Sequence, residues 1–128
     1  LYESLDYLDN KVEVFAYYSA PSGIMPEGGW PAVVYVHGGE GSALPTWVQY
    51  WNDRGYAAIS MDHHGHYPDR TTNTPNPGPD KYGTWGDYDL PIDEQWYYHA
   101  VAQVIRATSL IGSFDEVNAD KIVNFSQY

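Results

Sequence analysis

The chain has 128 residues, of which 43% are hydrophobic, so it can form one domain with a core and is not intrinsically disordered. Its formal net charge of -11 repels a nucleic-acid backbone and an anionic membrane surface, so we expect neither as a partner. The absence of cysteine excludes disulfides, thiolate metal ligands and a cysteine nucleophile.

The first half of the chain is predicted to contain strands and one helix. Alternating polar and apolar residues over 11–17 predict a half-buried strand, and we expect residues 2–8 to pair with it. The apolar runs at 32–36 and 57–61 are typical of strands buried on both faces, as in parallel sheets. Residues 45–54 between these runs have helical spacing, which predicts a strand–helix–strand crossover.

The second half is predicted to contain a long loop over 63–92, a helix over 93–111 and a strand over 121–125. We expect His99 to pack within the helix rather than bind a ligand. The carboxylates of the loop are expected to be solvated, namely Asp69, Asp80, Asp87 and Asp89. The helix is expected to bury one stripe of side chains, comprising Trp96, Tyr97, Ala100, Val101, Val104, Ile105, Ala107 and Ile111.

A glycine-rich turn, His37-Gly38-Gly39-Glu40-Gly41, directly follows the buried strand at 32–36. Its glycines let the backbone turn sharply and leave N–H groups open to an anion. The turn lacks the Lys-Ser/Thr of a P-loop and the spacing of a dinucleotide-binding loop, so nucleotide binding is disfavoured. An oxyanion hole made by Gly38, Gly39 and Glu40 fits better. The alternative is a glycine-rich turn that binds no ligand.

Three blocks in chain order resemble the α/β-hydrolases, and more narrowly the acetyl xylan esterase and dienelactone-hydrolase-like branch. They are the glycine-rich turn, the segment from Trp47 through Gly55-Tyr56-Ala57-Ala58-Ile59 to Asp62, and residues 96–122. The resemblance implies an α/β fold with a mostly parallel sheet and flanking helices, a partial α/β-hydrolase fold in a single domain, 1–128. It also implies a serine-type ester hydrolase without a cofactor, acting on acetylated carbohydrate or another small ester.

The resemblance places the catalytic serine in a G-x-S-x-G elbow after the last strand. Ser126 is the serine that aligns there, but Asn124 and Tyr128 stand where the family has glycines. The Asp and His of the triad follow the serine in this fold, so we expect a fragment that lacks both. The family also often has glycine in place of Glu40. The alternative function is a non-catalytic, aromatic-rich binding or structural fragment.

A second candidate site is Asp62-His63-His64-Gly65-His66, where three imidazoles and a carboxylate could hold zinc or copper. A plain solvated loop is another interpretation. In the hydrolase interpretation, which we prefer, the loop borders the catalytic cleft and no metal is required. The substrate-pocket residues are then His37, Asp62, His63, His64 and His66.

The predicted last strand forms an exposed sheet edge, which invites pairing with another chain. We expect Val33, Val36 and Ile59 to be poorly shielded on one face of the sheet. A homo-oligomer or a complex with a complementary chain is therefore expected. The composition fits any compartment, among which we favour a secreted or periplasmic one.

Overall fold

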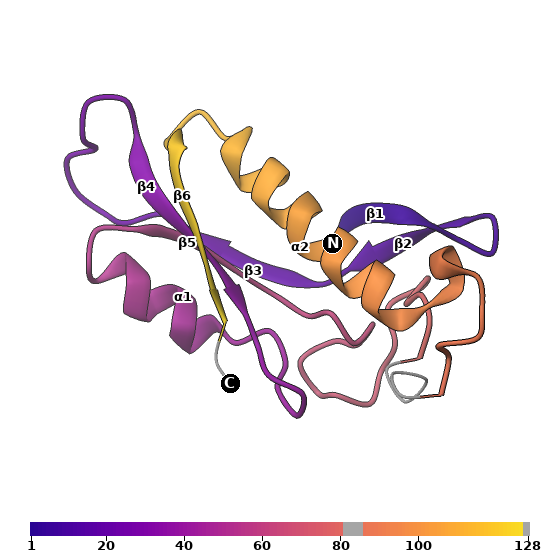
Figure 1. Ribbon diagram of the computed structural model, residues 1–128. Coiled ribbons are helices and arrows are strands. Elements are labelled where there is room, and N and C mark those ends of the chain that lie inside the picture. Colours follow the sequence, from indigo (N-terminus) through magenta and orange to yellow (C-terminus); the bar gives the residue numbers. More distant parts are fainter. Residues whose placement is uncertain (81–85, 127–128) are drawn as a thin grey trace.

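The computed structural model describes residues 1–80 and 86–126 and shows an α/β fold (Figure 1), which confirms the predicted fold class. Among the described residues, no helix has the length and apolar character that a membrane crossing requires. In chain order the elements are β1 (Tyr2–Tyr7), β2 (Asn10–Val14), β3 (Ala16–Ser19), β4 (Trp30–Val36), α1 (Pro45–Asn52), β5 (Ala57–Met61), the short 3-10 helix η2 (Ile92–Glu94), α2 (Trp96–Gly112) and β6 (Val117–Ser126).

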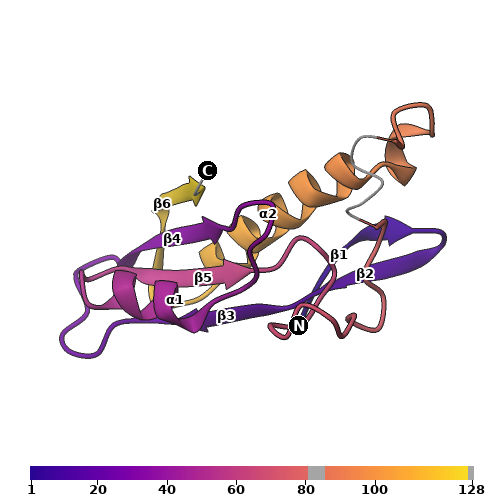
Figure 2. The same cartoon turned by 90° about the horizontal axis from the view of Figure 1, so that it is seen from below.

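The main sheet has four strands in the order β3-β5-β4-β6. Strand β4 is parallel to both β5 and β6, and β3 is antiparallel to β5. Strands β1 and β2 form a separate antiparallel hairpin that lies beside α2 (Figures 1 and 2). The predicted pairing of the first two strands is thus confirmed. The single strand expected over 11–17 is instead divided at Phe15, because β2 stays in the hairpin and β3 joins the main sheet.

The two helices cover opposite faces of the sheet, so the central strands are buried on both faces as predicted (Figure 2). On one face Tyr35 of β4 stacks on Trp47 of α1, and on the other Val34 packs in the core with Ala107 of α2. The expected exposure of Val33 and Ile59 is wrong, because they are 0% and 1% exposed. Residue Val36, at the end of β4, is partly buried.

Helix α2 begins where Asp87 caps it, since Oδ2 of this carboxylate accepts the N–H of Trp96 at 2.8 Å. Asp87 is buried, so the expectation that it is solvated is wrong. His99 is fully buried in the helix, as predicted. Three members of the predicted stripe are instead 48–59% exposed, namely Tyr97, Val101 and Ile105. No described element packs over that side of the helix.

Candidate active site

The carboxyl ends of three parallel strands meet at one edge of the sheet, where open α/β sheets bind ligands. Val36, the last residue of β4, pairs with Met61 of β5 on one side and with Ser126 of β6 on the other. The glycine-rich turn begins at the next residue, His37, and the second candidate loop begins at Asp62. The fold therefore brings the turn, that loop and Ser126 side by side.

Asp62 connects the two loops through its buried carboxylate. Oδ1 accepts from Nε2 of His37 at 2.9 Å, and Oδ2 accepts the N–H groups of His64 and His66 at 3.1 and 2.7 Å. Burial alone would raise the pKa of Asp62, but the hydrogen bonds from His37 and from the N–H of His66 outweigh it and lower the pKa. The carboxylate is thus kept charged and holds both loops in place.

The glycine-rich turn closes on the ring of His37. Nδ1 of His37 lies 2.7 Å from the carbonyl oxygen of Gly38, and the N–H of Gly41 donates to the same oxygen at 2.9 Å. A Cβ atom on Gly41 would lie 2.7 Å from Cβ of His37, so this position needs glycine for close approach. Gly39 and Glu40 are exposed at the tip of the turn. The oxyanion role of Gly38, Gly39 and Glu40 stays a prediction.

His63 stacks on His37 and is held neutral. Its Nε2 donates to the backbone oxygen of His37 at 2.8 Å, whereas its Nδ1 is buried without a hydrogen-bond partner among the described residues. Burial, and next the nearby His37 ring, lower the pKa of His63 to about 4. The imidazole is therefore uncharged at neutral pH.

The structure adds His37 to the histidines that a metal ion could use. Ring nitrogens of His37, His63 and His64 lie within 4.8 Å of one another, and His66 lies outside this cluster. The rings of His37 and His63 are stacked, with planes 11° apart. Because imidazole lone pairs lie in the ring plane, these two rings cannot both point at one ion without rotating. The arrangement suits a hydrogen-bonded core better than a metal centre.

The predicted pocket residues separate into three environments. His37 and Asp62 are buried, at 1% and 2% exposure. His64 and His66 line a small pocket of about 130 Å³. His63 lines an apolar groove of about 420 Å³ between α2 and β6, together with Val36, Trp96, Tyr97, Ala100, Val101, Val104, Ile105, Asn124 and Ser126. The structure thus brings Ser126 and His63 to one groove.

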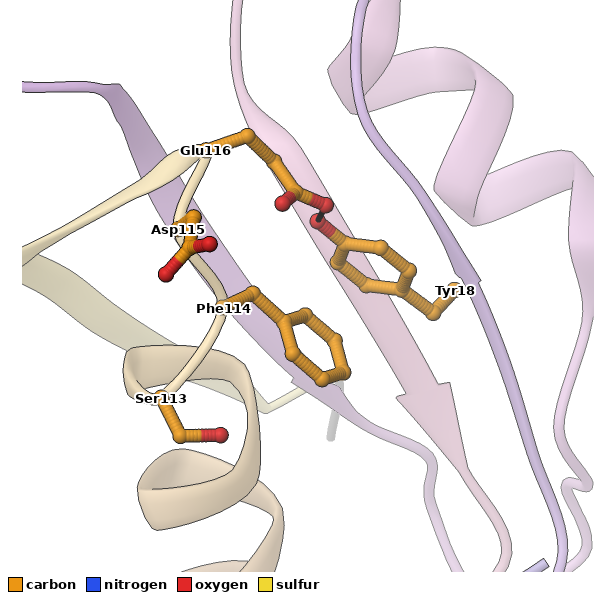
Figure 3. A pocket seen from close by; sticks show the side chains of 5 residues that line it. All are labelled: Tyr18, Ser113, Phe114, Asp115 and Glu116. Atoms are coloured by element: carbon orange, nitrogen blue, oxygen red, sulfur yellow. Dashed lines mark hydrogen bonds between the residues drawn. The ribbon is translucent and has the colours of Figure 1, made fainter.

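A further pocket, of about 340 Å³, lies near the start of β6, away from the carboxyl ends of the parallel strands (Figure 3). The hydroxyl of Tyr18 donates to Oε1 of Glu116 at 2.7 Å, and the ring of Phe114 packs edge-on against Tyr18. Burial, and next the bond to Glu116, raise the pKa of Tyr18. This pocket was not among the predicted sites, and the bond between Tyr18 and Glu116 fixes the turn before β6 to β3.

No protein-family model matches the chain, and no curated protein sequence matches it. Among solved structures, it is similar to an acetyl xylan esterase from Paenibacillus sp. R4, with a TM-score of 0.70 and 25% sequence identity over 91% of this chain. It is also similar in fold to a putative dipeptidyl aminopeptidase IV from Bacteroides ovatus, with a TM-score of 0.59 and 12% identity over 96% of this chain.

The match covers 37% of the esterase chain and 16% of the peptidase chain, so this chain spans well under half of either protein. Both similar structures are α/β-hydrolases. The chain therefore has part of an α/β-hydrolase-type fold, as the resemblance implied.

Proposed function

We propose that this chain, whose fold is part of the α/β-hydrolase type, supplies the oxyanion loop and part of the substrate pocket of a serine-type carboxylic ester hydrolase. One structural arrangement, the position of Ser126 beside the start of the glycine-rich turn, supports this proposal. Ser126 pairs with Val36, so it lies beside the residue from which the glycine-rich turn starts, in a fold similar to that of an acetyl xylan esterase. A nucleophile and backbone donors on adjacent strands are what acyl transfer requires.

In this proposal Oγ of Ser126 attacks the ester carbonyl carbon, and the carbonyl oxygen gains the negative charge. The N–H groups of Gly38, Gly39 and Glu40 hold that oxygen. The bond to the alcohol oxygen breaks, the proton lost by the Ser126 hydroxyl passes to that oxygen, and the acyl group remains on Oγ. Water then hydrolyses this acyl-serine, which releases the acid and restores the hydroxyl. His63 is not the general base, because Nε2 donates to a backbone carbonyl and Nδ1 is buried. We assign the base and the triad carboxylate to no residue of this chain.

The proposed substrate is an acetylated carbohydrate or another small ester, because the similar esterase is an acetyl xylan esterase. The loop from Asp62 to His66 would form one wall of the pocket. His66 is partly exposed and His63 borders the groove that contains Ser126. No metal or cofactor takes part in this proposal.

The test is hydrolysis of p-nitrophenyl acetate, followed by acetate release from acetylated xylan. Because the chain is assigned no general base, we expect slow turnover above buffer, due to Ser126 and the oxyanion N–H groups alone. Ser126→Ala should abolish it, whereas Ser109→Ala, an exposed serine on α2, should leave it unchanged. Turnover that survives Ser126→Ala would reject the nucleophile. Absence of turnover in the unmodified chain would reject the enzyme and favour the second function below.

The second candidate function is a non-catalytic binding fragment, and the exposed apolar side chains around β6 favour it. We define the β6 surface as Tyr97, Val101 and Ile105 of α2 with Val123 and Phe125 of β6, each 40–59% exposed. Strand β6 is at the edge of the described sheet, so its outer N–H and C=O groups are available for pairing. The proposed partner is a second copy of the chain or a complementary chain.

A further inference from the structure

Ser126 lies on the face of β6 that helix α2 covers. Two residues earlier in this strand, the side-chain oxygen of Asn124 accepts a hydrogen bond from the hydroxyl of Thr108 of α2 at 3.2 Å. The ring of Phe125 is instead stacked with Tyr35, on the face of the sheet that α1 covers. Side chains alternate between the two faces along a strand. Ser126 therefore directs its hydroxyl to the α2 side, where it lines the groove of about 420 Å³ between α2 and β6.

The groove between α2 and β6 is apolar over most of its wall. Its apolar lining residues include Val36, Trp96, Ala100, Val101, Val104 and Ile105. The chain carries 17 acidic residues, yet none of the described residues that line this groove is Asp, Glu, Lys or Arg. His63 also lines it and is uncharged at neutral pH. The groove therefore suits an apolar, uncharged group better than the hydroxyl-rich carbohydrate part of an ester.

The groove is much larger than an acetyl group requires. A methyl or methylene group occupies roughly the 30 Å³ of one water molecule, so a chain of eight carbons needs about 240 Å³. Such a chain fits within the 420 Å³ of the groove, whereas the methyl group of acetate fills only a small part of it. Val101 and Ile105 in its wall are 58% and 59% exposed, so a chain that lies on them removes apolar surface from water.

We infer that the groove between α2 and β6 binds the acyl part of the ester, as an apolar chain of about four to eight carbons. This inference rests on the proposed function and narrows its substrate from small esters in general to esters of longer acyl groups. In the proposed reaction the acyl group remains on Oγ of Ser126 after the alcohol leaves, so its chain is attached at a residue that lines the groove. Each methylene buried there should raise kcat/KM about two- to fourfold.

Hydrolysis of p-nitrophenyl acetate, butyrate, hexanoate and octanoate tests the acyl specificity. The four esters share one leaving group, so we expect kcat/KM to rise at least about tenfold from acetate to hexanoate. Val101→Trp, which fills the groove from an exposed position, should lower the ratio of hexanoate to acetate at least about fivefold. Ser109→Trp, at an exposed position of the same helix outside the groove, is the matched control and should leave the ratio unchanged. A ratio of one or less in the unmodified protein would overturn the inference.

Binding of hexanamide, a neutral compound without an ester bond, tests the groove independently of turnover. In ¹⁵N NMR spectra of the whole chain, we expect hexanamide to shift the amide resonances of Val101 and Asn124, which line the groove. The resonance of Ile24, which is 96% exposed in a distant loop, should not move, and acetamide should shift none of the three. Ser126→Ala should still bind hexanamide, because the apolar wall of the groove is intact in this variant.

The two measurements separate failure of the inference from failure of the proposed function. Hexanamide that binds no better than acetamide would overturn the inference, even in a protein that hydrolyses p-nitrophenyl acetate. Hexanamide bound in the groove without hydrolysis of any ester would reject the proposed function and, with it, the acyl assignment. Resonances of Val101 and Asn124 that shift on raising the protein concentration alone would show that a second copy occupies the groove. That result, which the second candidate function predicts, would also overturn the inference.

Discussion

The ring of His63 stacks on the ring of His37, with centroids 4.0 Å apart and planes 11° from parallel. The stack lies between the glycine-rich turn and the loop after β5, and both rings are buried. Two imidazoles at this distance cannot both be charged without strong repulsion, and the ring of His37 already faces a carboxylate. His63 is therefore the ring that stays neutral, and its protonation should open the site.

This arrangement predicts acid destabilisation above pH 4. His63 has a pKa of about 4 in the fold against an ordinary 6.5, so below pH 6.5 the unfolded chain binds a proton that the folded chain does not. Stability should fall as pH decreases from 6.5 to about 4, by about 3 kcal/mol in total. The lowered pKa of Asp62 contributes only at lower pH, because the unfolded carboxyl gains its proton near pH 3.8.

The measurement is urea unfolding at pH 7.5, 6, 5 and 4.5. His63→Gln should make the free energy of unfolding nearly independent of pH over this range. His66→Gln is the matched control, since His66 is partly exposed and outside the stack. An unmodified protein that is equally stable at pH 7.5 and 4.5 would contradict the prediction.

Gly41→Ala should destabilise the fold by about 1–3 kcal/mol. The added methyl group would lie 2.7 Å from Cβ and 2.8 Å from Nδ1 of His37, and this buried ring is held by Asp62 and cannot move freely. Gly39→Ala is the matched control for stability, because a Cβ there meets nothing within 4 Å. Chemical denaturation of the two variants checks the prediction, which fails if both lose the same stability.

Tyr18→Phe should lower stability by about 1–2 kcal/mol, because the hydroxyl makes a charge-assisted hydrogen bond to Glu116 (Figure 3). That bond lowers the pKa of Glu116 below its ordinary 4.5. The contribution of this pair is present above pH 4.5 and is lost as pH falls through the lowered pKa. Thermal unfolding at pH 6 and pH 3.5 measures both effects. Tyr88→Phe, on an 80% exposed side chain, should have neither, and a similar loss in that variant would argue against a specific bond.

The strands of the fold could be predicted because their signals are local. The run 57–61 is β5 residue for residue, and the pairing of residues 2–8 with the strand after them is recovered. The break at Phe15 could not be predicted, because β3 leaves the hairpin to pair with β5, whose residues lie 39 to 45 positions further along the chain. The burial of Asp87 was missed for a similar reason. Its bond to the N–H of Trp96 depends on how the loop folds back onto the helix.

The candidate site shows the same division between local and long-range information. Asp62, His63 and His64 are adjacent in the sequence, so their proximity could be predicted. The hydrogen bond from His37 to Asp62 could not, because His37 lies 25 residues before Asp62. Parallel strands brought these segments to one sheet edge. The predicted strand–helix–strand crossover could have indicated this, since the carboxyl ends of the parallel strands at 32–36 and 57–61 lie at the same edge of the sheet. Side-chain direction could not be inferred, so the burial of His37 and Asp62 emerges only from the structure.

The β6 surface predicts association with another chain. Val123 and Phe125 are exposed on one face of the sheet, Val101 and Ile105 lie on the helix that covers the other, and the unpaired edge of β6 runs between them. A partner that adds a strand to this edge would bury apolar groups on both faces at once. The net charge of -11 opposes self-association, but at physiological salt it is screened beyond about 8 Å.

We expect sedimentation at micromolar concentration to show an oligomer, or a monomer that binds a dye for exposed apolar surface. The double variant Val101→Lys and Ile105→Lys should shift the protein toward a monomer and reduce dye binding, since two charges then interrupt the apolar surface. Ile24→Lys is the matched control, because Ile24 is 96% exposed in a loop far along the chain from the β6 surface. A monomer without dye binding in the unmodified protein would show that these apolar side chains need no partner. Equal effects of both substitutions would show that association does not depend on the β6 surface, because the lysines reduce the negative charge and by charge alone would favour association.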